Sequence, residues 1–198
     1  MPKFQHELTE LITTAATYGE LFKKNEDSER FDKVMLFGKK LAKEEYMIGF
    51  AGHFSAGKSS MINALTSGDL LPSSPIPTSA NIVKVKKSDT DYAIIHLMDG
   101  KALKYEGHDF PNAVKTYSKD GFSVSLVEIG HKDSALPKGI TVMDTPGVDS
   151  TDDAHRQSTE SALHLADLVF YTMDYNHVQS ELNFSFTKEL MRHNPNVY

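Results

Sequence analysis

Two kinds of hydrophobic spacing alternate along this chain of 198 residues. Residues 3–23 carry apolar side chains at intervals of three and four, which predicts an amphipathic helix. Polar residues 25–28 break the pattern, and Ser28 is a suitable N-cap for a second helix that extends to about residue 42. Two interpretations stay open: the hairpin packs its apolar side on the rest of the chain, or it forms a neck that binds another helix. The apolar positions of the first helix are Phe4, Leu8, Leu11, Ile12, Ala15, Tyr18 and Phe22.

From residue 47 onward, short apolar runs alternate with helical patterns. Strands are predicted over residues 47–51, 81–87, 91–98, 122–129, 140–143 and 168–173. Helices are predicted over residues 61–66, 111–118, 158–166 and 180–192. Turn residues at 87–90 predict that the second and third strands pair with each other. The alternation as a whole predicts an α/β fold with a mostly parallel sheet and helices on both faces.

The segment that joins the first strand to its helix, residues 47–60, reads MIGFAGHFSAGKSS. Its second half fits the phosphate-loop pattern G-x-x-x-x-G-K-[ST], with Gly52, Gly57, Lys58 and Ser59 at the fixed positions. The glycines permit a tight turn, and the loop amides and helix N-terminus attract an anion. Lys58 would bind the β- and γ-phosphates, and the Ser59 hydroxyl would bind Mg²⁺. The pattern predicts a nucleoside triphosphate site.

Two later segments add candidate groups for hydrolysis. Asp144 directly follows a predicted strand, in the sequence DTPG, where nucleotide hydrolases place a carboxylate that holds Mg²⁺. Gly147 would let a backbone amide approach the γ-phosphate. Thr78 ends a proline-rich, extended loop and is a candidate for a second hydroxyl on Mg²⁺ and for contact with the attacking water. The sequence DTPG alone is also common in turns, so the prediction depends on finding the phosphate loop, Thr78 and DTPG in this order.

Composition narrows the alternatives. A net charge of −6 disfavours nucleic acid as the main partner. The absence of cysteine excludes a disulfide framework and a cysteine-zinc site. No apolar run approaches the ~18 residues of a membrane span, and the first ten residues lack the apolar core of a signal peptide. The nine histidines show no metalloprotease spacing. A soluble, cytoplasmic chain is therefore expected.

The motifs GHFSAGKSS, PIPTSA and DTPGVDS, in this order, resemble those of the GTPase domain of the dynamin superfamily, and the bacterial dynamin-like proteins most of all. The resemblance covers residues 45–198 and implies a P-loop NTPase (G-domain) three-layer sandwich that binds and hydrolyses GTP with Mg²⁺. Residues 1–44 are similar in position to a helical neck segment. The resemblance further implies self-association through the nucleotide face and membrane remodelling. Peripheral contact at the inner face of the cell membrane would use regions absent from this chain.

The resemblance also assigns roles to individual residues. It implies that Thr78 is the switch-one threonine and that residues 144–147 open switch two. The implied Mg²⁺ ligands are Ser59, Thr78 and Asp144, and the groups implied in catalysis are Ser55, Lys58, Thr78 and Gly147. Ser55 is also implied to help hold a monovalent cation. The implied phosphate loop consists of Gly52, His53, Phe54, Ser55, Ala56, Gly57, Lys58, Ser59 and Ser60.

Three features depart from the family pattern. Phe54 stands where eukaryotic dynamins typically have Gln, and Val148 stands where Ras-like enzymes place a water-positioning Gln. No [NT]-K-x-D motif, which reads guanine, is present. Residues 194–198, NPNVY, look like the start of the strand that leads to this motif, so the G domain is expected to be incomplete at its C-terminal end. Two other functions stay open: a non-catalytic interaction module, and an ATP-hydrolysing phosphate-loop protein.

Overall fold

The computed structural model describes residues 2–53, 55–72, 81–117, 123–147, 162–174, 181–194 and 196–198. The chain divides into two compact units, Met1–Tyr46 and Met47–Tyr198. The first unit holds α1 (Pro2–Lys24) and α2 (Ser28–Ala42). The predicted cap is wrong by one residue. Asp27 is the N-cap of α2, and its carboxylate accepts the Arg30 amide at 3.1 Å.

Helices α1 and α2 pack against each other through small residues. A Cβ added at Gly19 would lie 3.1 Å from the Met35 sulfur, and one added at Gly38 would lie 3.5 Å from the Ala15 Cβ. The missing side chains therefore let the two helices approach closely. Even so, α2 has no fully buried residue. Three large side chains of α1 at intervals of seven residues remain half exposed: Phe4 at 52%, Leu11 at 51% and Tyr18 at 51%.

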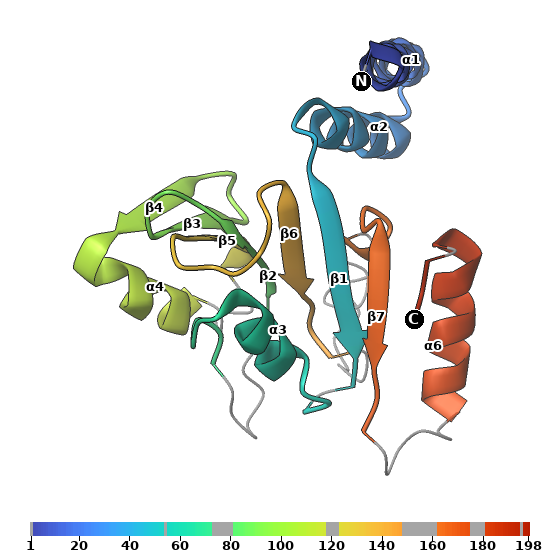
Figure 1. Ribbon diagram of the computed structural model, residues 1–198. Helices are drawn as coiled ribbons and strands as arrows, with labels where there is room; N and C mark the ends of the chain where they lie inside the picture. The colour runs from blue at the N-terminus through green and yellow to red at the C-terminus, as the bar shows by residue number, and fades with distance from the viewer. Residues whose placement is uncertain are drawn as a thin grey trace. The chain divides into compact units, whose positions relative to one another are not determined.

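The second unit is built on a seven-stranded sheet with the order β4-β3-β5-β2-β6-β1-β7 (Figure 1). This arrangement confirms the predicted α/β class. The helices bounded within the described residues of this unit are α3 (Lys58–Thr66), α4 (Phe110–Tyr117) and α6 (Glu181–His193), and the 3₁₀ turn η1 (Gly107–Asp109) precedes α4. Its strands are β1 (Tyr46–Gly52), β2 (Ile82–Lys87), β3 (Tyr92–Leu97), β4 (Ala102–Glu106), β5 (Val124–His131), β6 (Ile140–Asp144) and β7 (Leu168–Thr172).

Strand directions differ between the two ends of the sheet. In Figure 1 the arrows of β6, β1 and β7 point the same way, and the β1–β7 pair is parallel with Gly52 opposite Thr172. At the other end β2 is parallel to β5 but antiparallel to β6, and β3 is antiparallel to both β4 and β5. The carboxyl ends of β6 and β1 therefore meet at one edge, which is where the phosphate loop begins.

The predicted pairing of the second and third strands is wrong, because β5 lies between β2 and β3. Residues 88–91 connect these two strands. Neighbouring strands are about 4.8 Å apart, so a connection across one intervening strand spans about 10 Å, which four extended residues can cover. The sequence does not distinguish such a connection from a hairpin turn.

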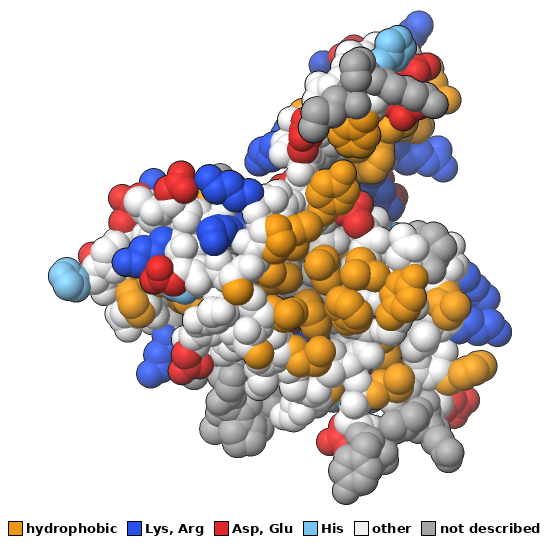
Figure 2. Space-filling view, viewed as in Figure 1, with side chains coloured by type: hydrophobic (Ala, Val, Ile, Leu, Met, Phe, Trp, Pro, Cys, Tyr) orange, Lys and Arg blue, Asp and Glu red, His pale blue; other side chains and the backbone are white. Residues whose placement is uncertain are grey.

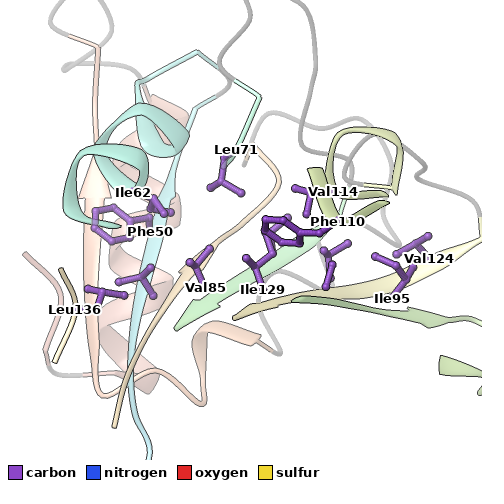
Figure 3. Close-up of a cluster of buried hydrophobic side chains, with 14 residues drawn as sticks. Phe50, Ile62, Leu71, Val85, Ile95, Phe110, Val114, Val124, Ile129 and Leu136 are labelled. Carbon is purple, nitrogen blue, oxygen red and sulfur yellow. The ribbon is translucent and has the colours of Figure 1, made fainter. Parts of the chain in front are cut away.

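Two hydrophobic clusters fill the two faces of the sheet, because alternate residues of a strand point to opposite sides. Phe50 and Val142 belong to one cluster, and their neighbours Ala51 and Met143 belong to the other. The first cluster, shown in Figure 3, includes Ile62 of α3 and Phe110 and Val114 of α4. The second includes Leu163, and Phe186 and Leu190 of α6. Helices therefore cover both faces, as predicted.

Hydrophobic side chains also gather on the surface over β1 and β7, as Figure 2 shows. Phe170 of β7 remains 36% exposed, although its ring lies 5.5 Å from the Phe50 ring.

Of the helices that the structure describes, none is long and apolar enough to cross a membrane.

Candidate nucleotide-binding site

The loop between β1 and α3 has left-handed backbone at three positions. The φ angles are 144° at Gly52, 58° at Ser55 and 92° at Gly57. An L-residue is disfavoured there, so Ser55 is an uncommon case. At Gly52 the structure adds a cause that the sequence did not show: a side chain would overlap the carbonyl oxygen of Thr172 in the neighbouring strand. The loop thus leaves the sheet through a point where only glycine fits.

Helix α3 begins directly after this loop. Its first helical bond runs from the Met61 amide to the Gly57 carbonyl at 2.9 Å. The amides of Lys58, Ser59 and Ser60 precede that bond, and amides of a first helical turn have no acceptor within their helix. Together with the helix dipole, they form the kind of N-terminus that binds phosphate.

The ammonium group of Lys58 is held inside the loop. Nζ donates to the Gly52 carbonyl at 3.1 Å and to the His53 carbonyl at 2.7 Å, and the residue is only 6% exposed. A buried ammonium requires such partners, because its charge is otherwise costly to remove from water. The loop therefore places a positive charge next to the α3 N-terminus, where a phosphate chain would lie.

Ser59 and Asp144 meet although 85 residues separate them in the sequence. The Ser59 hydroxyl donates to Asp144 Oδ2 at 2.6 Å, and Asp144 is 1% exposed at the end of β6. A hydroxyl and a carboxylate are hard oxygen ligands of the type that Mg²⁺ takes in nucleotide sites. This donor set therefore fits Mg²⁺, and the structure brings together two of its three predicted ligands.

Thr145 is a buried residue of this site that sequence reasoning missed. It is 0% exposed, and its hydroxyl donates to the Phe50 carbonyl of β1 at 2.8 Å. The sequence carried one signal for this residue: a hydroxyl side chain directly follows a predicted buried strand and its carboxylate. Pro146 is also buried, and Gly147, which is partly exposed, follows it.

The remaining predicted residues divide into two groups. Phe54 and Thr78, as well as Val148, lie outside the described residues. The loop residues that are described lie between β1 and α3, where the pattern placed them. Of these, Ser55 and Ser60 are exposed, whereas His53, Ala56 and Gly57 are partly buried. The predicted monovalent-cation role of Ser55 stays a prediction.

The last three residues extend the sheet beside β7. The Val169 amide donates to the Asn196 carbonyl at 2.9 Å, and the Tyr198 amide donates to the Val169 carbonyl at 2.9 Å. A parallel bridge joins Val169 to Val197. Residues 196–198 thus pair with β7 in the parallel direction.

The sequence profile of the dynamin family matches residues 48–197, which include the phosphate loop, Asp144 and Gly147. The chain belongs to the dynamin family. Dynamin-like protein A of Bacillus subtilis (strain 168) is 44% identical over 183 residues, which cover 91% of this chain and 15% of that protein. The bacterial dynamin-like protein of Nostoc punctiforme is 26% identical over 162 residues, which cover 74% of this chain and 23% of that protein.

Solved structures agree on the fold. An oligomerised bacterial dynamin pair, described as a mechanism for long-range sensing and tethering of membranes, matches with a TM-score of 0.58 at 20% identity. The match covers 93% of this chain and 36% of that chain. A second structure of such a pair matches with a TM-score of 0.52 at 14% identity. The resemblance to the dynamin G domain is confirmed, and this dynamin-family chain spans well under half the length of these relatives.

Proposed function

We propose that this chain is the GTP-binding and GTP-hydrolysing domain of a dynamin-like membrane-remodelling protein. The observation that carries the proposal is the 2.6 Å contact between the Ser59 hydroxyl and the Asp144 carboxylate, beside the buried ammonium of Lys58. Lys58 and Ser59 are the first two residues of α3, and Asp144 ends a separate strand, β6. Membership of the dynamin family makes guanine nucleotide the ligand to test first.

In this proposal, the amides of residues 58–60 and the Lys58 ammonium bind the phosphate chain. Ser59, Asp144 and Thr78 hold Mg²⁺, which when bound offsets negative charge on the β- and γ-phosphates. The Gly147 amide donates to the γ-phosphate, and Thr78 orients the attacking water.

The reaction in the proposal is attack of this water on the γ-phosphorus. The bond to the β–γ bridging oxygen breaks, the water passes one proton to solvent or to the released phosphate, and GDP and inorganic phosphate leave. Ser55 would help to hold a monovalent cation, which would supply positive charge beside the phosphates.

The test is Lys58→Ala in the full-length protein, with nucleotide affinity measured by calorimetry. Charge-assisted hydrogen bonds contribute about 1.5–3 kcal/mol each, so affinity for GTP should fall by about 100-fold. Lys138→Ala is the matched control, because this lysine is 79% exposed and pairs only loosely with Asp89 at 3.6 Å. Unchanged affinity in folded Lys58→Ala protein would refute the site. Competition by ATP as strong as that by GTP would refute guanine specificity.

The proposal extends to residues 1–44, which we infer to be a helical neck. The division of the chain between Tyr46 and Met47 supports a separate segment. Phe4, Leu11 and Tyr18 remain half exposed at intervals of seven residues, and this spacing is typical of a helix that binds a further helix.

Self-association through the nucleotide face belongs to the same proposal. So does peripheral membrane contact at the inner face of the cell membrane, through regions outside residues 1–198. Both are supported by family membership and by the oligomerised, membrane-tethering pair that shares the fold.

A further inference from the structure

Thr145 ties the end of β6 to the strand that leads into the phosphate loop. Its hydroxyl donates to the Phe50 carbonyl at 2.8 Å, and both residues are 0% exposed. β6 and β1 are neighbours in the sheet, and Phe50 lies two residues before Gly52. The bond therefore joins the two elements whose ends supply Asp144 and the loop.

Consecutive residues are anchored to different elements at this edge of the sheet. Asp144 accepts a hydrogen bond from Ser59 of α3 at 2.6 Å, and Thr145 donates one to Phe50 of β1. β6 ends at Asp144, so the Thr145 hydroxyl supplies a hydrogen bond to β1 just beyond the end of the strand. A buried carbonyl requires a donor, so this bond is costly to lose. The direction of the Asp144 side chain depends on the backbone at the end of β6, which the Thr145 bond holds.

We propose that Thr145 is a positioning residue of this site, an inference that rests on the proposed function. Its hydroxyl fixes the end of β6 against β1, so that Asp144 and Ser59 remain close enough to share one cation. The residue touches neither nucleotide nor metal. It acts through Asp144. Loss of its hydroxyl therefore changes the Mg²⁺ dependence of nucleotide binding rather than the binding of the phosphate chain by Lys58.

Two substitutions in the full-length protein separate the hydroxyl from the shape of the side chain. Thr145→Val keeps the volume and β-branching but removes the donor, whereas Thr145→Ser keeps the donor. The affinity for a non-hydrolysable GTP analogue is measured at increasing Mg²⁺ concentrations. The quantity compared is the Mg²⁺ concentration at which the Mg²⁺-dependent gain in affinity is half complete. Thr145→Val should raise this Mg²⁺ concentration about 10-fold and should change the affinity without Mg²⁺ less than about twofold. For Thr145→Ser, the Mg²⁺ concentration should stay within about threefold of the wild-type value.

Thr66→Val is the matched control. Thr66 is also 0% exposed, and its hydroxyl donates to the Ile62 carbonyl at 2.8 Å, away from Asp144. The same chemical change should leave the Mg²⁺ dependence unaltered. A double-mutant cycle adds a second readout: in an Asp144→Asn background, Thr145→Val should have less than about a twofold further effect, because its action passes through the carboxylate.

The outcomes are separable. Wild-type protein that shows no Mg²⁺-dependent binding of the analogue overturns the proposed function and this inference with it. Wild-type protein that binds, with Thr145→Val behaving identically, overturns only the inference. The inference is also overturned if Thr145→Val changes the Mg²⁺ dependence as strongly in the Asp144→Asn background as in the wild-type protein. If circular dichroism shows that Thr145→Val does not fold, Thr145→Ala, whose smaller side chain leaves room for a water at the carbonyl, takes its place and faces the same criteria.

Discussion

Replacing Gly52 with alanine perturbs the point where the phosphate loop leaves the sheet. The added Cβ would overlap the Thr172 carbonyl oxygen and lie 3.0 Å from the carbonyl carbon. Both atoms belong to the backbone of β7, so no side chain can rotate away. Because carbon–oxygen contacts are ordinarily about 3.3 Å or longer, β1 and β7 must separate by about 1 Å at this end.

The expected cost has two parts. A separation of this size breaks about two ladder hydrogen bonds near the Gly52–Thr172 pair, at about 1 kcal/mol each. Alanine at a φ of 144° adds about 1–2 kcal/mol of backbone strain. The sum is about 3–4 kcal/mol. A chain of this size loses about 2–4 °C in Tm per kcal/mol, so we expect Tm to fall by about 6–16 °C.

Thermal unfolding followed by circular dichroism measures this fall, and Gly100→Ala is the matched control. Gly100 has a φ of 85°, and a Cβ there would meet nothing within 4 Å, so only the strain remains. The control should lose about 1–2 kcal/mol. If Gly52→Ala lowers Tm no more than Gly100→Ala does, the predicted overlap with the Thr172 carbonyl of β7 does not destabilise the fold, and the reasoning is wrong.

Two further predictions concern other parts of the chain. Burial raises the pKa of Asp91, but hydrogen bonds from the Lys132 amide and from His131 outweigh burial and hold the pKa below its ordinary value. A lowered pKa in the folded state stabilises the fold above the unfolded pKa of about 3.9, so Asp91→Asn should lose about 1–2 kcal/mol at pH 7. In urea titrations this difference should shrink as pH falls below about 4, and a pH-independent difference would contradict the reasoning. In the proposed neck, Leu11→Asp should make residues 1–44 of the full-length protein about fivefold more sensitive to protease, because burying the remaining half of Leu11 contributes about 1 kcal/mol. Glu10→Ala is the neighbouring control, and equal sensitivity of the two variants would count against a bound helix.

Local pattern was enough to place most elements. The helix predicted over residues 3–23 is observed as Pro2–Lys24, and the one predicted over residues 180–192 is observed as Glu181–His193. Strand β4 was not predicted, because four of its five residues are exposed at the edge of the sheet and its alternating signal consists of only two apolar residues, Leu103 and Tyr105. The N-cap of α2 is Asp27 and not Ser28, since both are good caps and only the hydrogen bond decides between them.

The sequence by itself determined the phosphate loop, its glycines and the order of the motifs, because these depend on residue types at fixed local spacing. The tertiary structure alone decided three other features. β5 lies between β2 and β3, the Thr172 carbonyl excludes a side chain at Gly52, and the Thr145 hydroxyl bonds to the Phe50 carbonyl. Each depends on which strands become neighbours. Strand pairing joins segments far apart in the chain, and its energy comes from backbone hydrogen bonds and burial that many registers could satisfy.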